Sequence, residues 1–216
     1  MNIDQIKKEF PIFDNKVQNN DLVYLDSANS SQKPRIVIDR IYDFYSKEFS
    51  NVGRSVHYLA VAATNLYEQT RTSVQKYINA SDKNEIVFTK GATEAINLVA
   101  NTFGQKYLDE GDEVLITELE HHSNYVPWHF LRKSKKINIE FAEVNDQGEV
   151  TLEEIKKKIT DRTKIICVTH LSNVTGAILP IKEIVSFAHS KGIPVLVDGC
   201  QLSLIHISEP TRLERI

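Results

Sequence analysis

The sequence predicts an α/β protein with a mostly parallel sheet and helices that flank it. From residue 85 onward, short β-branched or apolar runs alternate with segments that repeat apolar residues at helical spacing. That alternation is typical of βαβ crossovers, which join parallel strands. Polar residues follow four of the predicted strands, at the edge where open α/β sheets bind their ligands. The pattern therefore predicts both the fold class and the edge of the sheet that carries the site.

The strands and helices of this region are read from their periodicity. The predicted strands are Glu85 to Phe88, Glu113 to Thr117, Ile137 to Val144, Lys164 to His170 and Pro194 to Asp198. Helices are expected between them, starting near Thr93, over Asn124 to Lys133, and over LEEIKKKI and IKEIVSFAHSKG. Together these elements make the alternating unit on which the fold prediction depends.

The first part of the chain reads as mainly helical. Apolar residues recur at helical spacing over Arg35 to Phe49 and Ala60 to Ile78, and a short helix is expected over Ile3 to Glu9. YLDSANSSQKP, Tyr24 to Pro34, predicts a short strand followed by a polar turn, with Pro34 where a helix can begin.

Composition excludes several classes of protein. The 216 residues include 26 Lys and Arg against 29 Asp and Glu, and 41% are hydrophobic, as in ordinary globular proteins. With a net charge of −3, the chain is not a basic protein that neutralises many phosphates, so no nucleic-acid partner is expected. No run reaches the roughly 18 apolar residues of a membrane helix, and cytoplasm is the expected location. Cys167 and Cys200 are expected to be reduced thiols, with no metal site.

The first candidate site is TKGATEAIN, directly after the strand at Glu85 to Phe88. Gly91, Ala92 and Thr93 stand at a helix start, where unpaired backbone N–H groups and the positive dipole end suit a phosphate. The alternative is that Thr93, with a glutamate soon after it, simply caps the helix.

The second candidate is ELEHHSNYVPW, after the strand at Glu113 to Thr117. A histidine there can stack on a planar heteroaromatic ligand or act as a general acid or base. Adjacent His121 and His122 cannot both point the same way, and no third ligand has a recognisable spacing, which disfavours metal. An ordinary pair of surface histidines is the alternative.

Two further candidates follow the last two strands. In THLSNVTG, Ser172 and Asn173 can hydrogen-bond a ligand, or Asn173 can be an ordinary turn former. In VLVDGCQ, Asp198 ends a buried parallel strand, where a carboxylate needs a cation unless it caps the following turn. A protonated pyridine nitrogen is such a cation, and this pairing is how proteins keep pyridoxal phosphate an electron sink.

Together these motifs resemble the class V aminotransferase family, within it the cysteine desulfurases, and most specifically their SUF-type (group II) branch. The likeness covers residues 1 to 201, and the most discriminating element is EHH followed by VPW. It implies the large domain of a pyridoxal 5'-phosphate-dependent transferase of fold type I. It also implies a homodimeric parent enzyme that takes sulfur from L-cysteine, leaves L-alanine, and passes a persulfide to an acceptor protein of iron–sulfur cluster assembly.

The resemblance assigns a role to six positions. Ala92 and Thr93 match the phosphate-binding turn, and His121 matches the catalytic histidine that stacks on the ring and relays protons. Asn173 matches the residue near the ring hydroxyl and the substrate carboxylate. Asp198 matches the pyridinium partner, and Gln201 matches the donor to the ring hydroxyl.

The sequence also departs from the family pattern. Gly53 stands where NVHRGVH has a histidine, Cys200 replaces the usual alanine, and Asn29 replaces the alanine of DSAAS. Neither Cys167 nor Cys200 aligns with the cysteine that carries the persulfide.

The family's Schiff-base lysine, catalytic cysteine and small C-terminal domain have no match in this chain. Leu202 to Arg212, LSLIHISEPTR, is similar to the in-frame translation of a transposase adapter used to prepare sequencing libraries. We therefore interpret residues 1–201 as the N-terminal segment and a partial cofactor-binding domain, and 202–216 as a non-native tail. The 216 residues are expected to be inactive on their own and, lacking the sheet partners of Glu85 to Phe88, prone to aggregation.

Two alternatives remain open. The same fold and cofactor serve selenocysteine lyases, cysteine sulfinate desulfinases and kynureninase-like hydrolases. A non-catalytic scaffold module that engages iron–sulfur assembly proteins is the alternative from a different class.

Overall fold

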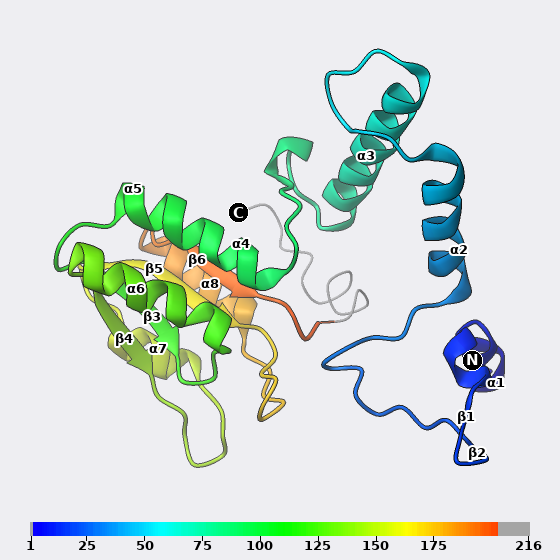
Figure 1. The fold of residues 1–216 in the computed structure, drawn as a ribbon. Coiled ribbons are helices and arrows are strands. Elements are labelled where there is room, and N and C mark those ends of the chain that lie inside the picture. Colours follow the sequence, from blue (N-terminus) through cyan, green and yellow to red (C-terminus); the bar gives the residue numbers. More distant parts are fainter. Residues whose placement is uncertain (1, 203–216) are drawn as a thin grey trace. The chain divides into compact units, whose positions relative to one another are not determined.

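A computed structural model describes residues 2–202 of the chain, which divides into two units at Tyr77 and Ile78. The adapter-like segment, Leu202 to Arg212, lies outside the described residues except for its first residue. Figure 1 colours the chain from blue at its start to orange at the end of the described range.

The first unit is mainly helical, as predicted. Its elements are α1 (Ile3–Lys8), a 3-10 turn η1 (Pro11–Asp14), the antiparallel strands β1 (Lys16–Val17) and β2 (Asn20–Asp21), α2 (Arg35–Asp43), a π turn η2 (Phe44–Glu48) and α3 (Tyr58–Tyr77). The helix predicted over Arg35 to Phe49 is thus divided into an α and a π segment.

The strand predicted at Tyr24 is wrong. Residues 22–26 join no sheet, and a turn follows at residues 27–29. The Tyr24 hydroxyl lies 3.1 Å from the carbonyl oxygen of Asp26 and 2.5 Å from that of Ser30, and closes this turn. A local side-chain contact therefore replaces the ladder of hydrogen bonds that a strand needs.

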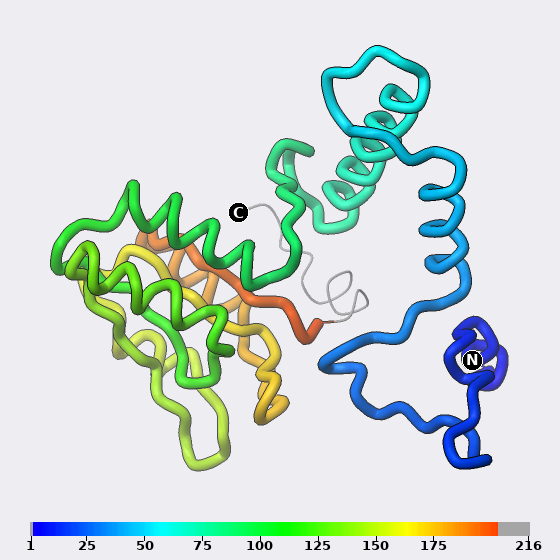
Figure 2. The backbone as a smooth tube through the Cα atoms, viewed as in Figure 1, coloured from blue at the N-terminus to red at the C-terminus, as the bar shows by residue number. Residues whose placement is uncertain are grey.

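The second unit contains the alternating strands and helices. Its elements are η3 (Lys83–Glu85), α4 (Ala92–Val99), η4 (Ala100–Gly104), α5 (Gln105–Tyr107), β3 (Glu113–Thr117), η5 (His122–Asn124), α6 (Val126–Lys135), β4 (Asn138–Ala142), α7 (Leu152–Lys158), β5 (Thr163–Thr169), α8 (Ile181–Ser190) and β6 (Val195–Asp198). The tube in Figure 2 follows the same chain from α4 to the end of β6.

The sheet is parallel throughout, in the order β4-β3-β5-β6. Its register pairs Ile116 with Cys167 and Thr169 with Asp198. Because all four strands run in one direction, their carboxyl ends and the polar loops that follow lie at one edge. The predicted α/β class with a parallel sheet is confirmed.

Alternate residues of each central strand face opposite sides of the sheet, as a β-strand requires. In β3, Leu115 packs toward α7 and α8, whereas Val114 and Ile116 pack toward α4 and α6. Figure 1 shows α4 and α6 together on their side of the sheet. Both faces are covered, so β3 and β5 read as continuous apolar runs.

The strand predicted over Glu85 to Phe88 is also wrong. Glu85 ends the 3-10 turn η3, and residues 86–89 belong to no strand of the described sheet. Val87 is 64% exposed and Phe88 41% exposed. Whether an apolar run becomes a strand depends on a neighbouring strand, and this segment joins neither described edge strand, β4 nor β6.

The core of the second unit generates a stability prediction. Ile184 of α8 is fully buried, so Ile184→Ala should lower the free energy of unfolding by about 2–5 kcal/mol through lost apolar contacts and a cavity. Urea unfolding followed by the fluorescence of Trp128, the chain's one tryptophan and fully buried, measures this change. Ile178, 71% exposed, is the matched control, and Ile178→Ala should change the value by less than about 0.5 kcal/mol. Equal losses in both variants would contradict the described core.

Candidate functional site

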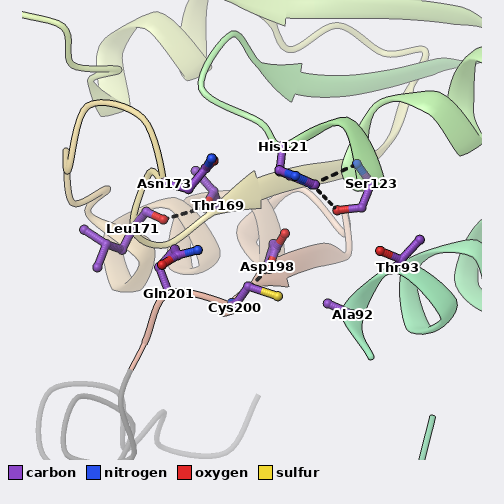
Figure 3. A pocket seen from close by; sticks show the side chains of 10 residues that line it. All are labelled: Ala92, Thr93, His121, Ser123, Thr169, Leu171, Asn173, Asp198, Cys200 and Gln201. Atoms are coloured by element: carbon purple, nitrogen blue, oxygen red, sulfur yellow. Dashed lines mark hydrogen bonds between the residues drawn. The ribbon is translucent and has the colours of Figure 1, made fainter. Parts of the chain in front are cut away.

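A pocket opens at the edge of the sheet where the strands end. Its cavity has a volume of about 140 Å³. Its lining residues are Ala92, Thr93, His121, Ser123, Thr169, Leu171, Asn173, Asp198, Cys200 and Gln201 (Figure 3). All six residues singled out from the sequence therefore line one cavity, although they come from four separate segments.

One wall of the pocket is the N-terminus of α4. The residue before the helix, Gly91, has extended backbone and makes no side-chain cap hydrogen bond. The carboxylate of Glu94 instead accepts the N–H of Lys90 at 2.6 Å. The glutamate considered as a capping partner thus binds the loop, and the first N–H groups of α4 point toward the pocket end of the helix. Figure 3 shows Ala92 and Thr93 on one side of Asp198 and Asn173 with Gln201 on the other.

His121 stands at the mouth of the pocket, directly before η5. Its Nδ1 accepts the backbone N–H of Ser123 at 3.2 Å and lies 2.8 Å from the Ser123 hydroxyl oxygen. Because a backbone N–H can only donate, this contact favours the imidazole form whose proton is on Nε2. The His122 ring lies at 90° to it and is not part of the lining.

Asp198 is the buried charge of the pocket. Its side chain ends β6, the residue is 6% exposed, and Oδ1 accepts the N–H of Cys200 at 2.9 Å. Within residues 2–202, no lysine or arginine pairs with this carboxylate. A buried carboxylate that has only the N–H and the thiol of Cys200 as partners is favourable only beside a cation. The arrangement therefore favours a positively charged ligand group in the cavity.

The two polar residues in the loop after β5 have different roles. Ser172 is 3% exposed, and its hydroxyl oxygen accepts the N–H groups of Val174 and Thr175, both at 3.3 Å. It forms the turn. Asn173 is exposed and lines the pocket beside Gln201.

Four residues of this region were not singled out from the sequence. Ser123, Thr169 and Leu171 line the pocket, and Glu120, which does not line it, accepts the backbone N–H of Thr169 at 2.8 Å. Burial raises the pKa of the Glu120 carboxyl to about 6, and the negative charge of Asp198 acts in the same direction, against three hydrogen bonds. Only the place of Glu120 in EHH is a signal in the sequence, because Thr169 and Asp198, which lie near it, are on other strands.

Two other findings bear on the kind of site. Among the described residues, no cluster of three His, Cys, Asp or Glu side chains has the geometry to hold a metal ion. None of the helices in residues 2–202 has the length and apolar content to cross a membrane.

The comparisons with known proteins agree on one family. The model of "Aminotransferase class-V" matches residues 23–208. A "Probable cysteine desulfurase" of Halalkalibacterium halodurans is 46% identical over 201 residues, 93% of this chain and 50% of that protein. A "Cysteine desulfurase" of Synechococcus elongatus is 45% identical, over 95% of this chain and 33% of that protein.

Solved structures give the same result. The apo structure of a cysteine desulfurase from Thermococcus onnurineus matches with a TM-score of 0.83 and 34% identity, over 91% of this chain and 47% of that one. A cysteine desulfurase of Escherichia coli matches with a TM-score of 0.81 and 35% identity, over 96% of this chain and 51% of that one. The chain spans half or less of the length of these curated relatives. The resemblance to the class V aminotransferases and, within them, to the cysteine desulfurases is confirmed, whereas the SUF-type branch stays a prediction.

The thiol of Cys200 offers a test of the charge on Asp198. Partial burial raises the pKa of the Cys200 thiol, and the charge of Asp198 raises it further. Asp198→Asn should lower that pKa, because it removes the charge and keeps an oxygen for the Cys200 N–H, so a thiol reagent at about pH 8 should react faster. Alkylation at a series of pH values, located by mass spectrometry, measures the midpoint. Buried Cys167 should stay unmodified in the folded chain, and an unchanged Cys200 midpoint in the variant would contradict the assignment.

Proposed function

Because this chain belongs to the class V aminotransferase family, we propose that its pocket holds pyridoxal 5'-phosphate and that it is part of a cysteine desulfurase. The observation that carries the proposal is the buried Asp198 carboxylate, which has no cation of residues 2–202 beside it and faces a cavity that ends at a helix N-terminus. A ligand with a cationic ring nitrogen at one end and a phosphate at the other would pair the nitrogen with the carboxylate and the phosphate with the N–H groups of the helix N-terminus.

Each lining residue fits one part of this ligand. The N–H groups of Ala92 and Thr93 would hold the phosphate at the N-terminus of α4. Asp198 would hold the proton on the ring nitrogen, since its charge favours the protonated ring. Asn173 and Gln201 lie where side-chain amides would contact the ring hydroxyl.

His121 would orient the ring and move a proton. Its imidazole stands over the cavity, and the contact of Nδ1 with Ser123 leaves Nε2 as the nitrogen that carries the proton. An imidazole can both donate and accept a proton, which suits transfer of a proton to or from a substrate. The bound cofactor supplies an electron sink for bonds broken at the substrate α-carbon.

We propose L-cysteine as the substrate, following the names of the relatives. In the proposed reaction, a thiol of the enzyme takes the substrate sulfur and becomes a persulfide. The thiol gives up one hydrogen, and one hydrogen completes the methyl group of the L-alanine that leaves. A protein of iron–sulfur cluster assembly is the proposed sulfur acceptor, and the parent enzyme is proposed to be a homodimer.

We further propose that these 216 residues do not complete the reaction. The lining contributed by residues 2–202 contains no lysine to bond the cofactor. Its thiol, on Cys200, lies beside Asp198, whose negative charge disfavours the thiolate nucleophile.

The binding proposal is tested with pyridoxamine 5'-phosphate, which lacks the aldehyde that reacts with surface lysines. Asp198→Asn should weaken binding about 30-fold or more, since removing one partner of a buried charge pair costs about 2 kcal/mol or more. Equilibrium dialysis measures the dissociation constants. The control is Asp161→Asn, which neutralises an exposed aspartate at the opposite edge of the sheet and should change nothing. Equal affinity of wild type and Asp198→Asn would refute the proposed site.

The phosphate arm is tested separately. Pyridoxamine without its phosphate should bind the wild-type chain about tenfold or more weakly, because it cannot use the N–H groups of α4. Equal binding of the two compounds would remove the phosphate role of Ala92 and Thr93 and leave that of Asp198 intact.

The activity proposal is tested by incubating the chain with L-cysteine and pyridoxal 5'-phosphate. Alanine formation should not exceed that of free cofactor, because the pocket offers neither a lysine nor an accessible thiolate. Chromatographic measurement of alanine decides the question. Catalytic turnover that disappears in Asp198→Asn would overturn the proposal that these residues are inactive alone.

A further inference from the structure

One half-buried carboxylate near the pocket has no part in the function proposed above. Glu120 directly precedes His121, lies between the ends of β3 and β5, and does not line the cavity. Resting on the proposed function, we propose that Glu120 is a positioning residue that holds His121 over the pocket and adds a second negative charge behind Asp198.

Both oxygens of Glu120 act as hydrogen-bond acceptors. Oε1 accepts the hydroxyl of Thr117 at 2.6 Å and the backbone N–H of Thr169 at 2.8 Å. Oε2 accepts the side-chain amide of Asn124 at 2.7 Å. The side chain thereby joins the end of β3, the end of β5 and the turn that leads into α6.

The amide of Asn124 cannot be reversed to suit a different partner. Its oxygen accepts the indole N–H of Trp128 at 3.4 Å, and an indole N–H can only donate. The nitrogen of Asn124 must therefore face Glu120. Three donors converge on one side chain, so a carboxylate fits, whereas the amide of a glutamine would meet one donor with another donor.

These contacts fix the residues on either side of His121. Glu120 and Asn124 are joined through their side chains, and the N–H of Asn124 also donates to the carbonyl oxygen of His121 at 2.8 Å. His121 thus lies inside a closed loop anchored to β5 by the bond from Thr169 to Glu120. The place of the imidazole over the pocket follows from that anchor.

The charge of Glu120 is linked to the ligand through Asp198. The buried Cys167 thiol on β5 responds to Glu120 but carries no charge, since burial and then the charge of Glu120 raise its pKa. The titratable group that opposes a negative charge on Glu120 is Asp198 on β6, through repulsion between the two carboxylates. A cation beside Asp198 relieves this repulsion and favours ionised Glu120. By reciprocity, ionised Glu120 must strengthen binding of the cation.

The pH dependence follows with a definite sign. Burial and Asp198 raise the pKa of Glu120 to about 6, so the carboxyl is charged at about pH 7.5 and neutral at about pH 5. Its contribution to binding a cationic ring is therefore present above about pH 6 and lost below it.

The experiment compares the wild-type chain with Glu120→Gln, using pyridoxamine 5'-phosphate and equilibrium dialysis at both pH values. At about pH 7.5 the variant should bind about fivefold or more weakly, and at about pH 5 the two affinities should converge. Comparing two proteins with one ligand cancels the titration of the ligand itself. A ratio that does not change with pH indicates a merely structural role and overturns the charge part of the proposal.

Glu118→Gln is the matched control, because Glu118 lies two residues away, is exposed, and accepts one backbone N–H, that of Val144, at 2.9 Å. It should bind like wild type at both pH values. A loss equal to that of Glu120→Gln would overturn the specific role of Glu120. If Glu120→Gln does not fold, Thr117→Val keeps the charge but removes one donor, and should raise the pH at which affinity falls. An unchanged midpoint there would also overturn the proposal.

The positioning part is tested without ligand. Nitrogen NMR of His121 reports which ring nitrogen carries the proton, and Glu120→Gln should reduce the Nε2–H form, whereas Glu118→Gln should not. An unchanged His121 spectrum overturns the positioning role. If the wild-type chain does not bind the ligand, the proposed function fails while this measurement still decides on Glu120. If Asp198→Asn weakens binding and Glu120→Gln does not, only the Glu120 inference fails.

Discussion

The structure around the pocket depends on a negative charge buried at the end of a parallel strand. Asp198 is nearly inaccessible to water, and residues 2–202 provide it with a backbone N–H but no cation. A buried carboxylate of this kind is energetically unfavourable unless a cationic group of a ligand pairs with it. The edge of the sheet therefore holds a buried charge that has no cation among these residues, and the other lining residues lie around it.

The parallel sheet makes this arrangement possible. The register that pairs Thr169 with Asp198 aligns the ends of β5 and β6, and Glu120 joins the end of β3 to the same point. Apolar clusters on both faces hold the strands in place, since β3 and β5 send alternate side chains to each side. The polar loops can then carry His121 and Asn173 without contributing to the core. Packing and ligand recognition are thus divided between the middle and the edge of one sheet.

The failed strand predictions have a common physical cause. Helix formation depends largely on contacts within one segment, and the predicted helices over Ala60 to Ile78 and near Thr93 were confirmed. A strand needs a neighbour, and the apolar runs at Tyr24 and at Glu85 to Phe88 have none among the strands of the described sheets. Ser172 shows the same limit for side chains, because a hydroxyl that suits a ligand is equally suited to a turn.

The sequence by itself determined the α/β class and most of its elements, because periodicity is a local property of the chain, and its motifs carried the family resemblance that assigned the six residues found in the pocket. The tertiary structure decided which strands pair, and therefore that Thr169 lies beside Asp198 and that its N–H donates to the half-buried carboxylate of Glu120. Those relations join residues about thirty to eighty positions apart, and no local pattern specifies them. The buried environment that raises the pKa of Glu120 arises only when the three strand ends come together.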